Sequence, residues 1–167
     1  MAIKGGFIRG SDGFKVWMGL ASLVIVLDQL SKLITLNTLT HESSRVINSF
    51  INWVLVFNPG AAFSLLAQSG GWQKWLFTGI GSLAAIFIIW MLKRHAHQAM
   101  FCFSLSMILG GALGNVIDRI AYGAVVDFID VFYKDYHWPA FNLADSAIFL
   151  GTFLLIADEI RRVVRHR

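Results

Sequence analysis

No charged side chain interrupts residues 75–92, whose sequence is WLFTGIGSLAAIFIIWML. An apolar helix needs about 20 residues to cross the ~30 Å hydrocarbon layer of a bilayer, so this stretch has nearly the length of a membrane span. Three other apolar stretches are about as long, at residues 16–36, 99–117 and 140–163. The sequence therefore predicts an all-α membrane protein with four transmembrane helices, which form a single domain over residues 1–167.

The composition excludes two broad classes of protein. Hydrophobic residues make up 56% of the 167-residue chain and charged residues 14%, with a mean hydropathy of +0.63. An ordinary soluble domain has about 25% charged residues, so this chain lacks the polar side chains that a soluble globular enzyme needs on its surface. Disorder requires low hydrophobicity and high charge, which is the opposite pattern. The single cysteine, Cys102, excludes an intrachain disulfide and a cysteine-rich zinc site.

Basic residues flank the apolar stretches of this chain, whose net charge is +4. Those at the two ends and between the second and third stretches are Lys4, Arg9, Lys15, Lys93, Arg94, Arg161, Arg162, Arg165 and Arg167. Basic loops stay on the cytoplasmic side of a membrane, so four spans place both termini and the 93–94 loop in the cytoplasm. Membrane topology explains this distribution better than nucleic-acid binding, for which the basic residues would form a stripe.

Residues 46–66 form a fifth uncharged stretch, but we do not expect them to span the membrane. They contain three asparagines and the Pro59-Gly60 turn, and unpaired backbone at such a turn is costly in lipid. The alternation of side chains from Trp53 to Phe57 is typical of a strand. We therefore predict a small β element within the outer segment at residues 38–74.

Two aspartates have the features of a general acid–base pair. Asp127 lies in the apolar sequence Val125–Phe128, where burial would raise its pKa. Asp145 shares one face of a helix with Asn142 and Ser146, in the first turn of the fourth span. Two carboxylates close together at the lipid surface could share one proton and activate a water molecule, as in aspartic proteases. Spacing alone does not show that the two meet, and helix capping explains Asn142 and Asp145 equally well.

A charged pair interrupts the first span. Asp28 precedes Lys32 by four residues, and this order favours an ion pair along a helix. Charged residues within a membrane usually have a partner or a function. We favour the hypothesis of a structural ion pair, and the alternative is that Asp28 or Lys32 contacts a substrate.

The third span ends in a segment that combines glycines with polar residues. Gly110 and Gly114 form a G-x-x-x-G pattern, which permits close packing of helices. Asn115 and Arg119 follow one turn apart on the same helix face. Arg119 could bind a carboxylate or a lipid phosphate there, and the alternative is a structural pair with Asp118 or another acid. Farther back in the chain, Asn58 precedes a turn and either forms turn hydrogen bonds or binds a peptide backbone.

Four stretches of the chain together resemble the bacterial lipoprotein signal peptidase family, signal peptidase II. They are residues 27–32 (LDQLSK), 58–64 (NPGAAFS), 110–119 (GGALGNVIDR) with 125–128 (VVDF), and 141–146 (FNLADS). The similarity extends through nearly all of residues 16–160, with the stretches in the order and at the spacing of the family. Pro59 stands where the family often has threonine, and the proposed catalytic acids show no departure.

The resemblance implies a four-helix aspartic endopeptidase of the bacterial inner membrane, with a small β element and a short helix on the periplasmic side. It implies that Asp127 and Asp145 are the catalytic pair and that they act at the periplasmic face. Six further residues would line the site or lie beside it: Asn58, Asn115, Arg119, Asn142, Asp28 and Lys32.

The same resemblance implies a substrate and a class of inhibitor. The substrate would be a diacylglyceryl-modified prolipoprotein embedded in membrane phospholipid. The enzyme would cut it just before the lipid-bearing cysteine and so release the signal peptide. Globomycin-type cyclic peptides would inhibit the reaction, and no metal, organic cofactor or nucleic acid is implied. The expected assembly is a monomer.

A second hypothesis is a small membrane transporter or assembly subunit that uses intramembrane acids to move protons or ions. Such a function favours acids at several depths of the bundle. Here the predicted pair lies at one rim, and residues 75–92 contain no acid. The sequence therefore favours the peptidase.

Overall fold

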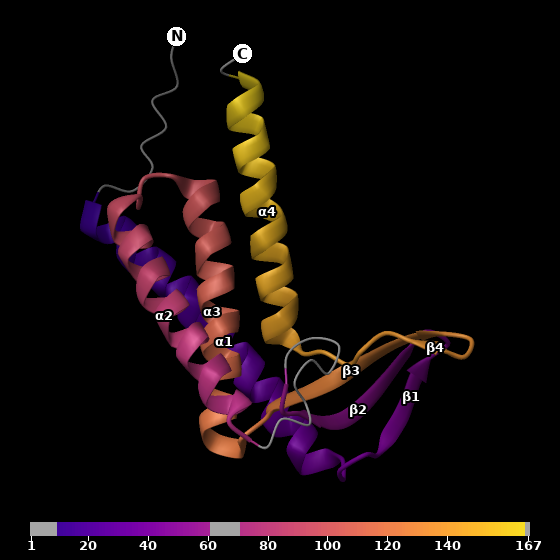
Figure 1. Cartoon of the computed structure of the whole chain (residues 1–167). Helices are drawn as coiled ribbons and strands as arrows, with labels where there is room; N and C mark the ends of the chain where they lie inside the picture. Colours follow the sequence, from indigo (N-terminus) through magenta and orange to yellow (C-terminus); the bar gives the residue numbers. More distant parts are fainter. Residues whose placement is uncertain (1–9, 61–70, 166–167) are drawn as a thin grey trace.

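The structure is a computed structural model that describes residues 10–60 and 71–165, and in this part of the chain four helices form a bundle (Figure 1). They are α1 (Gly10–Thr38), α2 (Gln73–Arg94), α3 (Ala99–Tyr122) and α4 (Leu143–Arg165). Each helix contains most of one predicted apolar stretch and extends past it into polar residues. The fourth helix begins at Leu143 instead of residue 140, because Asn142 caps its first turn.

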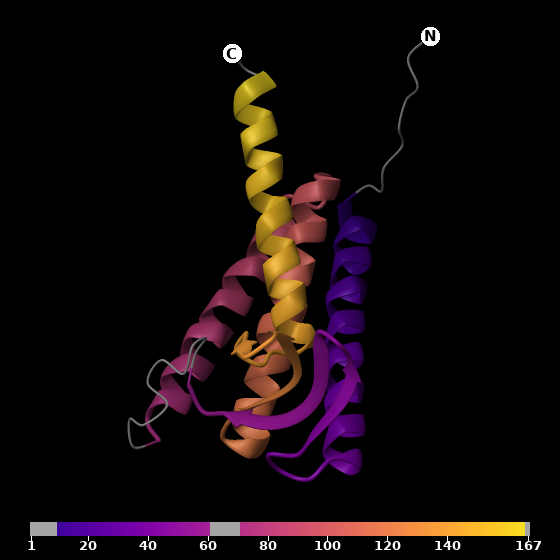
Figure 2. The ribbon, with the colours of Figure 1, turned by 90° about the vertical axis from the view of Figure 1, so that its right-hand side faces the viewer.

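Helix α3 lies at the centre of the bundle and contacts the other three helices (Figure 2). The predicted close packing of its glycines is confirmed, since a Cβ added at Gly110 would lie 2.6 Å from Val24 Cβ on α1. The helix continues past the predicted end to Tyr122. It stops there because Gly123 adopts a left-handed conformation, with φ of 76°, and donates its N–H to Arg119 O.

Antiparallel strands extend from one end of the bundle, opposite to the end at which α1 begins and α4 ends (Figure 1). They are β1 (Ser44–Asn48), β2 (Ile51–Asn58), β3 (Val125–Tyr133) and β4 (Tyr136–His137), in this order across the sheet. Strand β2 confirms the strand predicted around residues 53–57. It pairs with β3 so that Asn58 lies opposite Val125, which brings the end of β2 beside the start of β3.

The short helix that the resemblance implies is not found among the residues that the structure describes. Residues 61–70 lie outside them, and so does the 61–64 part of the predicted motif.

The surface of the bundle suits contact with lipid. Helices α1, α2 and α3 are long and apolar enough to cross a membrane. Helix α4 has the length but carries more charge, which includes Asp145, Asp158 and Glu159. Large apolar side chains are exposed on the helices, among them Leu83 at 69% and Phe149 at 75%. Exposed apolar surface on this scale marks a membrane or protein interface, so the fold is a helical membrane bundle with a small antiparallel sheet.

Candidate active site

The predicted site residues converge where the sheet meets the start of α4. Strand β3 carries Asp127, strand β2 ends at Asn58, and α4 begins directly after Asn142. Helix α3 contributes Asn115. Asp127 is 2% exposed and Asn142 is fully buried, so the polar groups here depend on one another for hydrogen bonds.

Asn142 and Asp145 form a reciprocal cap at the start of α4. The backbone N–H of Asp145 donates to Asn142 Oδ1 (2.8 Å), and the backbone N–H of Asn142 donates to Asp145 Oδ2 (3.3 Å). This is the arrangement of a capping box, which satisfies two otherwise unpaired N–H groups at a helix start. The capping interpretation is therefore confirmed. It leaves Asp145 Oδ1 directed at α3, where Asn115 Nδ2 donates to it (2.8 Å).

Asp127 accepts hydrogen bonds from two asparagine side chains. Asn58 Nδ2 donates to Oδ2 (3.1 Å), and Asn142 Nδ2 donates to Oδ1 (2.7 Å). The pKa of Asp127 is raised from 3.8 to about 7, mainly because burial penalises the charged form and next because of the negative charge of Asp145. The two hydrogen bonds act in the opposite direction. Asp127 can therefore hold a proton near neutral pH, as a general acid must.

One residue, Asn142, contacts both acids. Its backbone N–H and its side-chain oxygen bind Asp145, and its side-chain nitrogen binds Asp127. The structure thus brings together two carboxylates that the sequence spacing could not show to meet. Carboxylates in this proximity do not ionise independently, which allows one of them to act as an acid while the other acts as a base.

Arg119 binds backbone carbonyls and does not pair with Asp118. Its Nη1 donates to Asn115 O and its Nη2 donates to Gly60 O, both at 3.2 Å. Its guanidinium also lies over the Phe77 ring, 5.3 Å from the centroid. Among residues 10–60 and 71–165, no hydrogen-bond partner is found for its buried Nε atom. An unpaired buried N–H group is costly, so this position of Arg119 suits an oxygen acceptor.

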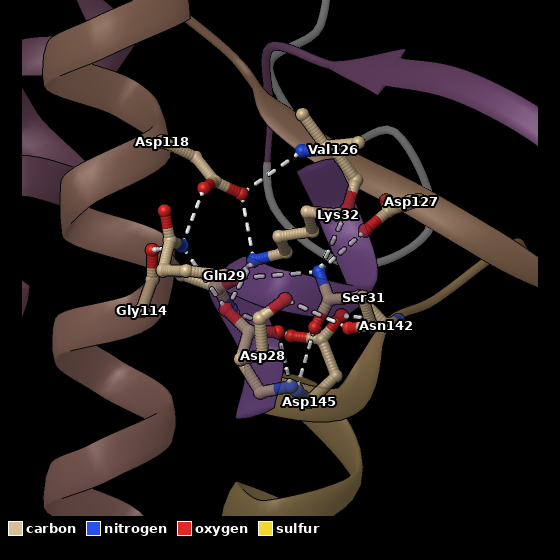
Figure 3. A network of polar contacts seen from close by, with 12 residues as sticks. Asp28, Gln29, Ser31, Lys32, Gly114, Asp118, Val126, Asp127, Asn142 and Asp145 are labelled. Atoms are coloured by element: carbon tan, nitrogen blue, oxygen red, sulfur yellow. Dashed lines mark hydrogen bonds and ion pairs between the residues drawn. The ribbon is translucent and has the colours of Figure 1, made fainter. Parts of the chain in front are cut away.

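A second group of charges lies fully buried beside the first (Figure 3). Lys32 Nζ is 2.7 Å from Asp28 Oδ2 and 2.6 Å from Asp118 Oδ2, and none of these three residues is more than 1% exposed. Gln29 Nε2 donates to the other oxygen of Asp118 (2.9 Å). Burial of this kind favours the structural ion pair over direct substrate contact for Asp28 and Lys32.

Asp118 and Gln29 were not predicted from the sequence as site residues. A signal was present, since Asp118 lies one helical turn after Asn115 and Gln29 directly follows Asp28. Among residues 10–60 and 71–165, no group of three or more His, Cys, Asp or Glu side chains is arranged to hold a metal ion.

Gly114 provides the space that the Asp28 carboxylate occupies. A Cβ added at Gly114 would lie 2.5 Å from Asp28 Oδ2. We expect Gly114→Ala to lower the free energy of unfolding by about 1–3 kcal/mol, which is the usual cost of overpacking a core. Thermal denaturation of the purified protein in detergent would measure the change. Gly19→Ala on α1 is the control, since nothing lies within 4 Å of its added Cβ; equal destabilisation by both substitutions would contradict the prediction.

Comparison with known proteins gives a consistent result. Residues 20–161 match the family model described as signal peptidase (SPase) II. The "Lipoprotein signal peptidase" of Cupriavidus necator is 58% identical over 151 residues, which cover 90% of this chain and 86% of that protein. The protein of the same name from a Janthinobacterium species is 50% identical over 163 residues, covering 98% of this chain and 99% of the relative.

Two solved structures have a similar fold. A bacterial membrane enzyme solved by the in meso method at 2.3 Å superimposes with a TM-score of 0.82 at 31% identity, over 92% of both chains. A second bacterial membrane enzyme, solved by the same method at 1.9 Å, gives a TM-score of 0.74 at 32% identity, over 86% of this chain and 92% of the other.

Proposed function

The chain belongs to the signal peptidase II family, and we propose that it cuts its prolipoprotein substrates as an aspartic endopeptidase with Asp127 and Asp145 as the catalytic pair. The family activity is removal of the signal peptide from prolipoproteins, and the predicted function agrees with it. The observation that carries the aspartic mechanism is the meeting of the two carboxylates around Asn142.

The proposed chemistry needs no group beyond these side chains and water. One carboxylate takes a proton from the attacking water, and the other gives a proton to the scissile carbonyl. The side-chain nitrogens of Asn115 and Asn142 already donate to the acids, so these two residues orient the pair. Arg119 is better suited to bind the scissile carbonyl oxygen while that oxygen accepts the proton, because its buried Nε has no hydrogen-bond partner among residues 10–60 and 71–165. Asn58 would bind the substrate beside Asp127.

We further propose that the substrate is diacylglyceryl-modified and is cut before the lipid-bearing cysteine. A lipid-anchored scissile bond lies at the membrane surface, and the candidate site lies where the helix bundle meets the sheet (Figure 1). We propose that globomycin-type cyclic peptides inhibit the enzyme. We also propose that the protein is a monomer embedded in membrane phospholipid. A transporter is not favoured, because the chain matches a peptidase family over residues 20–161.

The proposed location is the bacterial inner membrane, with α4 as a fourth span, both termini in the cytoplasm and the site at the periplasmic face. The arrangement of the bundle supports it, because α1 begins, α4 ends and α2 is joined to α3 at one end, opposite the sheet (Figure 1). Reporter fusions at residue 167 should be active only in the cytoplasm, and fusions within residues 38–60 only in the periplasm. A C-terminal fusion that is active outside would contradict the four-span topology.

Cleavage of a lipidated precursor by the purified protein tests the function directly. We expect a gel shift from precursor to mature lipoprotein, and no shift with a precursor that lacks the diacylglyceryl group. Liposomes that contain the protein provide the counter-test. Proton or ion flux without any cleavage would overturn the peptidase and favour the transporter.

A further inference from the structure

The amide groups around the two acids have orientations that their neighbours fix. Lys32 Nζ can only donate a hydrogen bond, and it donates to Asn115 Oδ1 (3.2 Å). The Nδ2 end of Asn115 must therefore point the other way, where it donates to Asp145 Oδ1 (2.8 Å). Rotation of this amide by 180° would place two donors together at Lys32 and two acceptors together at Asp145.

The same argument fixes the two asparagines at Asp127. The side-chain oxygen of Asn142 accepts from the backbone N–H of Asp145, and the side-chain oxygen of Asn58 accepts from the backbone N–H of Gly60 (3.1 Å). Both Nδ2 atoms consequently face Asp127. Each of the four carboxylate oxygens of Asp127 and Asp145 thus accepts a hydrogen bond from an N–H group. The three asparagine amides and the one backbone N–H that donate these bonds are fixed in orientation.

Lys32 is held in place by two carboxylates that also bind the backbone next to the two acids. Asp28 Oδ1 accepts the backbone N–H of Ala144 (2.9 Å), the residue before Asp145. Asp118 Oδ2 accepts the backbone N–H of Val126 (3.1 Å), the residue before Asp127. The buried cluster of Asp28, Lys32 and Asp118 therefore ties α1 and α3 to the two segments that carry the catalytic pair (Figure 3).

The surroundings of the two acids are not equivalent. Asp145 is the third residue of α4, where the positive end of the helix dipole stabilises a negative charge. Arg119 on α3 lies close enough to act by its charge on Asp145, Asp118 and Asp127. Asp127 lies on a strand and is 2% exposed. The charged groups that act on it are Asp145 from α4, Lys32 from α1 and Arg119 from α3.

We propose that Lys32, held between Asp28 and Asp118, is a positioning residue that keeps Asn115 donating to Asp145, so that Asp145 is the ionised general base and Asp127 the general acid that carries the proton. This inference rests on the proposed aspartic mechanism and assigns a role to each acid. The raised pKa of Asp127, about 7, agrees with the assignment.

The protons balance over one cycle. Asp145 takes a proton from water as the water oxygen bonds to the scissile carbonyl carbon, and Asp127 gives its proton to the carbonyl oxygen, which forms a neutral diol. The C–N bond then breaks as Asp145 passes its proton to the leaving nitrogen. Asp127 recovers a proton from the diol as the new carboxylic acid forms. Both acids end in the state in which they began.

The pH dependence of kcat/KM with a lipidated precursor tests this assignment, because the acidic limb reports the base and the basic limb reports the acid. Asn115→Ser removes a donor to Asp145 and should move the acidic limb to higher pH by about one unit, the size expected for a hydrogen bond to a charged group. Asn58→Ser removes a donor to Asp127 and should move the basic limb to higher pH instead. Asn37→Ser, at an exposed asparagine on α1, is the matched control and should leave both limbs in place.

Lys32→Met should move the acidic limb in the same direction as Asn115→Ser, because Asn142 Nδ2 (3.3 Å) is then the one side-chain donor left at Asn115 Oδ1 among the described residues. It should move the basic limb as well, because the positive charge of Lys32 also acts on Asp127. If Lys32→Met does not fold, the two asparagine variants alone decide the assignment. The assignment would be overturned if Asn115→Ser moved the basic limb and Asn58→Ser the acidic limb. It would also be overturned if neither variant moved a limb. Failure of the aspartic mechanism is a separate result, since it would appear as turnover by Asp127→Asn or Asp145→Asn.

Discussion

Asp127→Asn and Asp145→Asn should each lower cleavage of a lipidated precursor by at least ~10³-fold, because neither acid can do the work of the other. Asparagine keeps the shape of the side chain but only one of the two oxygens that accept hydrogen bonds in each acid, so cleavage is compared on variants that are shown to be folded. The double substitution should cost little more than either single one, as is usual for groups that act as a unit. Binding of the precursor should persist, since the acyl chains and the signal helix still bury apolar surface.

Asp135→Asn is the matched control for these variants. Asp135 is exposed in the turn between β3 and β4, so the same chemical change there should leave cleavage unchanged. Asp130 is less suitable, because it is only 8% exposed and accepts hydrogen bonds from Asn52 and His137. Substantial turnover by Asp127→Asn or by Asp145→Asn, measured on folded protein in detergent, would exclude the aspartic mechanism.

Stability against pH shows whether the Asp127 variant is folded and also tests its protonation. Burial, followed by the charge of Asp145, raises the pKa of Asp127 from 3.8 to about 7, so the folded protein binds this proton more tightly than the unfolded chain. The stabilisation from that proton is complete below about pH 4 and is lost as the pH rises through 7. Asp127→Asn lacks this ionisation, so its thermal stability relative to the wild type should increase between pH 4 and pH 8.

Contacts within one helix are the part of this site that the sequence allows one to predict. Asp28 and Lys32 pair at i, i+4, and Asn142 and Asp145 cap α4 at i, i+3, because helix geometry alone brings these residues together. Hydropathy likewise locates α2 and α3 to within about five residues. A helix that crosses the bilayer must consist mostly of apolar residues, so its extent can be recognised in the sequence.

Contacts between elements could not be predicted in the same way. Asn58 is 69 residues from Asp127, Asn115 is 30 residues from Asp145, and Lys32 is 83 residues from Asn115. No periodicity of the sequence relates such distant positions. That Asp127 and Asp145 act together was implied by the resemblance to a family and not by their spacing. The β2–β3 register and the close approach of α1 to α3 at Gly114 bring these residues together.

Lys32→Met should destabilise the fold more than Gly114→Ala does. Methionine fills a similar volume but removes the positive charge that lies within 2.7 Å of both Asp28 and Asp118. Two buried carboxylates would then face each other without a counter-ion. Loss of one partner from a buried pair costs about 3–5 kcal/mol, because the remaining charge is left uncompensated. Thermal denaturation in detergent should therefore show a large fall in Tm.

A second lysine on the same helix provides the control. Lys15 lies 3.6 Å from Asp12, but both side chains are about three-quarters exposed. Water already solvates this pair, so Lys15→Met should change stability by only a few tenths of a kcal/mol. Adding Asp118→Asn to Lys32→Met should restore part of the lost stability, since it removes one of the two uncompensated charges. If Lys32→Met is as stable as Lys15→Met, the buried cluster does not hold the bundle together.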